Sequence, residues 1–108
     1  MKQHTTPEQT AKLIKFGLPK PRHYSEDKYF IIHVGFEVIN YSIGELIKML
    51  PKKIKMSDDE TGELEISFGS LCMVYYTSFS VIYYDTEATE LIDALYDMVV
   101  KLKEEGVI

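Results

Sequence analysis

The sequence has only one cysteine and none of the residue patterns that usually mark a catalytic or metal-binding site. Because Cys72 is the only cysteine and lies in an apolar segment, an internal disulfide is excluded and a reducing, cytoplasmic location is expected. The three histidines, His4, His23 and His33, do not have metal-ligand spacing among themselves or with Cys72. The six glycines are too scattered to form a phosphate-binding loop. These absences predict a protein with no metal, no cofactor and no enzymatic activity.

Charge is absent from the 19 residues between Glu65 and Asp85, although 27% of the whole chain is charged. A run of this length could cross a membrane as a helix. Its composition argues against a membrane, because it is rich in serine and aromatic residues, and aromatic residues favour strands. The turn-type dipeptides 69–70 and 77–78 divide the region into strands expected at 63–68, 71–76 and 79–84. We therefore expect an antiparallel meander and no membrane contact.

The clearest helical pattern follows this run, between Thr86 and Glu105. Gly106 is expected to end the helix, with Val107 packing back on Leu102 in a Schellman motif. Seven apolar residues fall at the spacing of one buried helix face: Ala88, Leu91, Ile92, Leu95, Met98, Val99 and Leu102. A long C-terminal helix should therefore cover one face of the sheet.

A shorter helix is expected near the N-terminus, with a signal at each end. Thr6 and Gln9 have the spacing of a capping box, in which two side chains satisfy free backbone N–H groups. Gly17 should end the helix, and Leu18 can fold back on Leu13.

A second short helix is expected to start after Ser42 and to stop before Pro51. Ser42 and Glu45 form another capping box, and Tyr41 and Leu46 have the spacing of a hydrophobic staple around it. The face expected to point inward consists of Ile43, Leu46, Ile47 and Leu50.

Further strands are expected at 29–33, 36–39 and 53–56, and a turn at 58–62 should join the last of these to the strand at 63–68. The elements together predict a single domain, residues 1–108, of the α+β class. We expect an antiparallel sheet of about four to five strands with two or three helices, the long C-terminal helix packed on one face.

The two faces of the predicted sheet differ in character. In the strand at 63–68, the apolar residues Leu64, Ile66 and Phe68 alternate with polar ones, so one face is expected to be covered and the other to meet water. The next two strands are apolar on both sides, and a helix layer can cover only one. Tyrosines left on the open side can simply cover a central strand, or they can form a protein-binding or self-association surface. The residues that could form such a surface are Tyr75, Tyr76, Tyr83 and Tyr84, of which only one in each adjacent pair can point there.

Charge is distributed unevenly along the chain. Residues 1–55 carry a balance of +5, from ten basic and five acidic residues, whereas residues 56–108 carry −10, from two and twelve. The basic residues that could contact nucleic acid are Lys48, Lys52, Lys53 and Lys55, although lysines also protect edge strands from pairing. The acidic residues that could instead imitate DNA are Glu87, Glu90, Asp93 and Asp97.

Three strings in the sequence, TPEQTAKLIKFGLPKP, YSIGELIKMLPKKI and ELIDALYDMVVKLKEEGVI, resemble a family of small uncharacterised proteins carried by prophages and other mobile elements of gut Bacteroides-type bacteria. The likeness spans nearly the whole chain and is weakest between residues 56 and 84. It implies a phage-derived, soluble, cytoplasmic protein and supplies no catalytic residues.

Three classes of function follow from these observations. The first is a non-enzymatic accessory protein that acts by binding another protein or its own copy through the tyrosines. The second is a nucleic-acid-binding protein or acidic DNA mimic, although the net charge of −5 argues against nucleic acid as a partner. The third is an enzyme of unknown type, which would need a concave pocket with convergent polar groups.

Overall fold

The computed structural model describes residues 2–25, 40–56, 60–79 and 81–108. Within them lie helices α1 (Pro7–Lys15), α3 (Ile43–Met49) and α4 (Leu91–Glu104), and strands β1 (Lys53–Lys55), β2 (Thr61–Phe68), β3 (Cys72–Ser78) and β4 (Val81–Ala88). The four strands form one antiparallel sheet in the order β1-β2-β3-β4. The strands expected at 29–33 and 36–39 lie outside the described residues.

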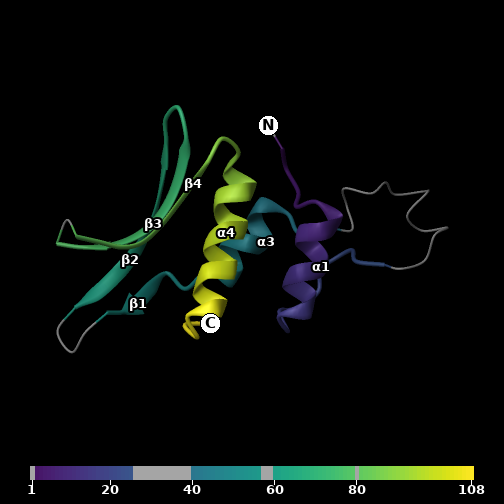
Figure 1. Ribbon diagram of the computed structural model, residues 1–108, viewed down its shortest axis with the longest axis horizontal. Helices are drawn as coiled ribbons and strands as arrows, with labels where there is room; N and C mark the ends of the chain where they lie inside the picture. Colours follow the sequence, from purple (N-terminus) through teal and green to yellow (C-terminus); the bar gives the residue numbers. More distant parts are fainter. Residues whose placement is uncertain (1, 26–39, 57–59, 80) are drawn as a thin grey trace.

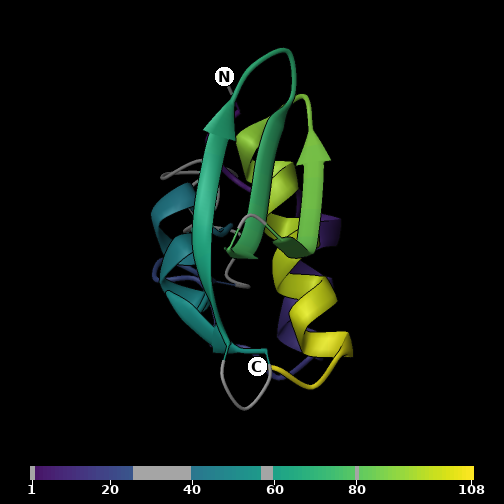
Figure 2. The ribbon, with the colours of Figure 1, turned by 90° about the vertical axis from the view of Figure 1, so that its left-hand side faces the viewer.

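The helices cover one face of this sheet in two successive layers. α3 and α4 lie side by side behind the sheet, and α1 packs beyond α4, so that α4 lies between the sheet and α1 (Figures 1 and 2). The predicted α+β class and the cover of the sheet by the C-terminal helix are therefore confirmed. The other face of the sheet, which faces the viewer in Figure 2, is not covered by any of the described elements.

Helix α1 begins and ends as its sequence predicts. The Thr6 hydroxyl accepts a hydrogen bond from the Gln9 N–H at 3.1 Å, and the Gln9 side chain accepts one from the Thr6 N–H at 2.8 Å. At the other end Gly17 has a φ of 87°, a conformation that glycine adopts without strain. The Leu18 N–H then donates to the Leu13 carbonyl at 3.2 Å, which completes the Schellman motif.

Helix α3 also has its predicted capping box, formed by Ser42 and Glu45. Leu46 and Leu50 are buried, as expected for the inward face. Ile47 is 36% exposed, so its inward assignment is wrong. The buried side of this short helix follows the line from Leu46 to Leu50, and Ile47 lies at the flank of that line.

The C-terminal helix starts later than its periodicity predicts. Residues Thr86 and Ala88, expected in the helix, belong to β4 and pair with Val74 and Cys72 of β3. The helix begins only at Leu91, because pairing with β3 holds the preceding residues in an extended conformation. Its predicted end is confirmed, since the Val107 N–H donates to the Leu102 carbonyl at 2.9 Å after Gly106 (φ 75°).

One of the two turns predicted within the uncharged run is confirmed and the other is displaced. β2 and β3 are joined by residues 69–71, as the dipeptide 69–70 indicates. Thr77 and Ser78 do not form a turn, because both extend β3 and pair with Ile82 and Val81 of β4. β3 therefore continues to the residue before Phe79, which has a φ of 48°.

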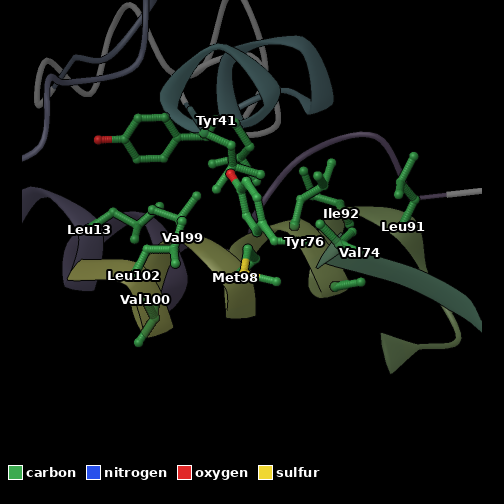
Figure 3. Packing of buried hydrophobic residues seen from close by; sticks show 14 of the residues in the cluster. Leu13, Tyr41, Val74, Tyr76, Leu91, Ile92, Met98, Val99, Val100 and Leu102 are labelled. Carbon is green, nitrogen blue, oxygen red and sulfur yellow. The ribbon is translucent and has the colours of Figure 1, made fainter. Parts of the chain in front are cut away.

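The core lies between the sheet and the helices. Val74 and Tyr76 of β3 meet Ile92 and Met98 of α4 there, and all four side chains are fully buried (Figure 3). Phe68 was expected to join them but is 69% exposed, because the β2–β3 hairpin extends past the N-terminal end of α4 (Figures 1 and 2). The buried apolar residues are Leu13, Tyr41, Leu46, Leu50, Ile54, Val74, Tyr76, Leu91, Ile92, Ala94, Leu95, Met98, Val99, Val100 and Leu102.

Candidate binding surface on the open face of the sheet

The adjacent residues Tyr75 and Tyr76 point to opposite faces of β3. Tyr76 is fully buried, and its hydroxyl donates to the Pro51 carbonyl at 2.6 Å. Burial raises the pKa of Tyr76 to about 12. Tyr76 therefore cannot contact a partner, which corrects its place among the expected surface residues. Tyr75 is half-buried on the open face, and its hydroxyl donates to Glu65 at 3.2 Å.

The second tyrosine pair is divided by an irregularity in the sheet. Tyr84 pairs with Tyr76 and packs edge-on against it, with ring centroids 6.5 Å apart, so Tyr84 contributes to the covered side. Thr77 pairs with Ile82, which leaves Tyr83 as an extra residue between the two pairings. Tyr83 is 36% exposed, and its hydroxyl donates to Glu60, the residue before β2.

The register of the sheet places charged residues on both sides of Tyr75. Glu65 of β2 and Asp85 of β4 pair with Tyr75 from its two neighbouring strands. The next row on the same face has Met73 of β3 at its centre and Glu87 of β4 at one side. The open face thus has an apolar line along β3 with carboxylates on the flanking strands.

Of the carboxylates on the open face, which also include Glu63 of β2, only some are neutralised. Lys53 of β1 makes an ion pair with Glu63 at 3.7 Å, between two well-exposed side chains. Within the part of the chain that the structure describes, Glu65, Asp85 and Glu87 have no ion-pair partner. The hydrogen bond to Glu65 raises the pKa of Tyr75, since it holds the phenol proton beside a carboxylate.

A shallow hollow of about 820 Å³ lies over the same face. One wall comes from Glu63 and Glu65 on β2, and Tyr75 lies at the centre. Ile82 and Phe79, which are 50% and 86% exposed, border the hollow on the β4 side. The hollow is thus acidic along β2 and apolar where Phe79 and Ile82 border it, whereas Asp85 and Glu87 of β4 are not part of its lining.

Sequence reasoning found Tyr75 but missed Asp85 and Glu87 as its neighbours. The helix prediction from Thr86 onward placed Glu87 on the wrong element. The alternation of acidic residues with Thr86 and Ala88 was the signal for a strand, and the helical spacing of the apolar residues that follow concealed it.

The four lysines expected to contact nucleic acid are all exposed, but they lie on different elements. Lys48 lies on α3, Lys52 precedes β1, and Lys53 and Lys55 belong to β1. Lys48, Lys52 and Lys53 border a second hollow, whose apolar lining includes Ile47.

The acidic residues expected to imitate DNA do not share one surface. Glu87 lies on the sheet, whereas Glu90 accepts a hydrogen bond from the Lys2 N–H at 3.1 Å, beside the start of α4. Asp93 accepts from the Lys2 ammonium at 2.9 Å and from the Gln9 amide at 3.0 Å. Burial would raise the pKa of Asp93, but these hydrogen bonds and the Lys2 charge hold it below its ordinary value. The N-terminal arm therefore occupies part of the proposed mimic.

Residues 2–25, 40–56, 60–79 and 81–108 contain no group of three or more histidine, cysteine, aspartate or glutamate side chains that could hold a metal ion. His4 forms an isolated bridge with Ser42, and the free thiol of Cys72 lies 3.8 Å from the Thr89 carbonyl. His33 lies outside the described residues. None of the described helices combines the length and the hydropathy that a membrane-spanning segment needs.

Comparisons with protein-family models, with curated proteins and with solved structures found no match for this chain. The resemblance to phage-borne proteins of Bacteroides-type bacteria therefore stays a prediction.

Proposed function

We propose that this chain is a non-enzymatic accessory protein that binds another protein, or a second copy of itself, through the open face of its sheet. The observation that carries the proposal is the contrast between the two faces. One face is covered by α3 and α4, whereas the other leaves Met73 and Tyr75 half-buried and Ile82 exposed around a hollow. A sheet normally buries an apolar face against a second layer, so a partner that covers this one gains apolar burial.

The proposed setting is the cytoplasm of a bacterium that carries a prophage or another mobile element. The single free cysteine supports a reducing compartment. The likeness of three sequence strings to phage-borne proteins supports the origin.

Site-directed photo-crosslinking in the native host tests the proposal. Benzoylphenylalanine in place of Ser67, which pairs with Met73 on the open face, should give a discrete adduct. The same probe in place of Lys15, an exposed residue of α1, is the matched control. An adduct of twice the 12.5 kDa chain mass would identify a second copy, and another mass would identify a different protein. Equal labelling from both positions, or none from Ser67, contradicts the proposal.

The gathering of Lys48, Lys52 and Lys53 around one hollow favours a second candidate, contact with nucleic-acid phosphates. Binding of this kind would weaken steeply with salt, because neutralised phosphates release their counterions. A gel shift with DNA and RNA at low salt tests it, and the absence of any shift removes it.

A further inference from the structure

We infer that the partner of the open face is a basic amphipathic helix of another protein, a conclusion that rests on the binding function proposed above. The covered face shows how this sheet accepts a helix, since α4 lies along it and buries Val74 and Tyr76. On the open face, the inner strand β3 presents Met73 and Tyr75, which alternate along the strand with Val74 and Tyr76. No described element lies over them.

The width of the apolar line fits one helix. The carboxylates of Glu65 and Asp85 come from the two strands that flank Tyr75, so their backbones lie two strand spacings apart, about 9.6 Å. A helix with its side chains is about 10–12 Å across. A helix along β3 therefore places its apolar stripe on Met73 and Tyr75, and residues at the edges of that stripe reach the carboxylates on both sides.

Charge selects a basic helix. The open-face carboxylates of Glu65, Asp85 and Glu87 lack ion-pair partners among the described residues. The Lys101 ammonium donates to the backbone carbonyl of Asp85 at 3.2 Å and makes no ion pair with its carboxylate. The chain as a whole carries −5, which attracts a cationic partner at long range. A second copy that met this face with its own open face would bring the same carboxylates and be repelled.

Tyr75 favours arginine over lysine at the edges of the apolar stripe, where the partner's basic residues reach the carboxylates. One oxygen of Glu65 accepts the Tyr75 hydroxyl, and its other oxygen has no partner among the described residues. A guanidinium can stack on the tyrosine ring and donate to a neighbouring carboxylate at once, whereas an ammonium has no flat face to stack.

A designed peptide tests this inference. It is about 18 residues long, with leucines at helical spacing along one face and arginines at both edges of that face. Fluorescence anisotropy measures its affinity for the full chain. We expect saturable binding that weakens as salt rises, and no binding of a peptide in which glutamates replace the arginines.

Paired variants separate this face from general electrostatic attraction. Glu65→Gln with Asp85→Asn should weaken binding about tenfold, because two flanking charges are lost. Glu8→Gln with Glu105→Gln changes the net charge equally at exposed positions of α1 and the end of α4, and should change affinity less than about twofold. Tyr75→Leu should cost about threefold, since the side chain stays apolar but loses its ring. Circular dichroism confirms that each variant is folded.

The inference is overturned if the arginine peptide does not bind, or if the two double variants weaken binding equally. Crosslinking from Ser67 does not depend on this peptide, so the two proposals fail separately. A Ser67 adduct without peptide binding would leave the binding function and remove the basic helix. A Ser67 adduct of twice the chain mass would also remove it, since the occupant would then be a second copy.

Discussion

Neighbouring tyrosines in this protein have different roles, because each side of the sheet gives them a different environment. The Tyr76 hydroxyl satisfies the Pro51 carbonyl next to the core, while the Tyr75 hydroxyl bonds to an exposed glutamate. The alternation of a strand predicts that one member of each pair points outward. It does not predict which one, since both strands are apolar at either parity. The extra residue at Tyr83 depends on pairing between strands, which no local pattern specifies.

The Tyr76→Phe substitution should lower the free energy of unfolding by about 1–2 kcal/mol, because it leaves the Pro51 carbonyl without its hydrogen bond. Urea denaturation measures this change. Tyr75→Phe removes the same atom from the open face and serves as the control, with an expected loss below about 0.5 kcal/mol. Equal losses in the two variants would contradict the assignment of the two faces.

Stability should fall as the solution becomes strongly alkaline. Burial raises the pKa of Tyr41 and Tyr76 to about 12 from the ordinary 10.0, and the charge of Glu45 adds to the effect at Tyr41. Between these values the unfolded chain loses phenol protons that the folded protein retains, so the free energy of unfolding decreases as pH rises. Urea denaturation between about pH 8 and pH 11 should show this fall. In the double variant Tyr41→Phe/Tyr76→Phe, the free energy of unfolding should fall less steeply with pH. If it falls equally steeply in variant and parent, the explanation is refuted.

At the scale of single elements, helix ends were predictable because their signals are local. The capping boxes at Thr6 and Ser42 and the glycines at the ends of α1 and α4 act within a few residues of the backbone they cap. The boundary between β4 and α4 was not predictable in this way. The side chain of Thr86 donates to the Ala94 carbonyl at 2.7 Å, and its backbone pairs with Val74, so contacts distant in sequence decide its conformation.

Two glycine substitutions should change stability in opposite directions. Gly44 lies within α3, and a Cβ there would meet nothing closer than the Ser42 hydroxyl at 4.0 Å. Gly44→Ala should therefore raise the free energy of unfolding by about 0.5–1 kcal/mol, because alanine loses less backbone freedom on folding. Gly17→Ala should lower it by about 1 kcal/mol, since the φ of 87° strains any other residue. Thermal denaturation compares the two variants with the parent. A change in stability of the same direction in both would contradict this account.

At the scale of the whole molecule, the two ends of the chain are held together by polar contacts. Lys2 and Gln9 both donate to Asp93, across 91 and 84 residues of sequence. The sequence alone predicts Asp93 on an acidic surface, because no local pattern shows that the N-terminal arm returns to α4.

The Asp93→Asn substitution should lower the free energy of unfolding by up to about 1 kcal/mol near pH 7. The lowered pKa of Asp93 means that its charge stabilises the fold above its ordinary value of 3.8, and that this contribution is lost as pH falls below it. The difference between variant and parent should therefore narrow between about pH 5 and pH 3. Burial raises the pKa of Asp97, and the neighbouring charge of Asp93 raises it further. The Asp93→Asn substitution removes this repulsion between the two carboxylates, which offsets part of the stability that the substitution costs.

Glu105→Gln is the matched control for this measurement, since it removes an exposed charge at the other end of α4. Chemical denaturation of both variants across this pH range should show a pH-dependent loss only for Asp93→Asn. A loss of constant size at every pH would mean that charge is not its cause.

The four strands follow one another in the sheet as they do in the chain, and α4 follows the last of them directly. Each pairing therefore closes a short loop, which costs little chain entropy and favours rapid folding. The contacts between the N-terminal arm and α4 close a loop of nearly the whole chain. We expect the meander and α4 to assemble first and α1 to dock last, so that the arm fastens a structure that has already formed.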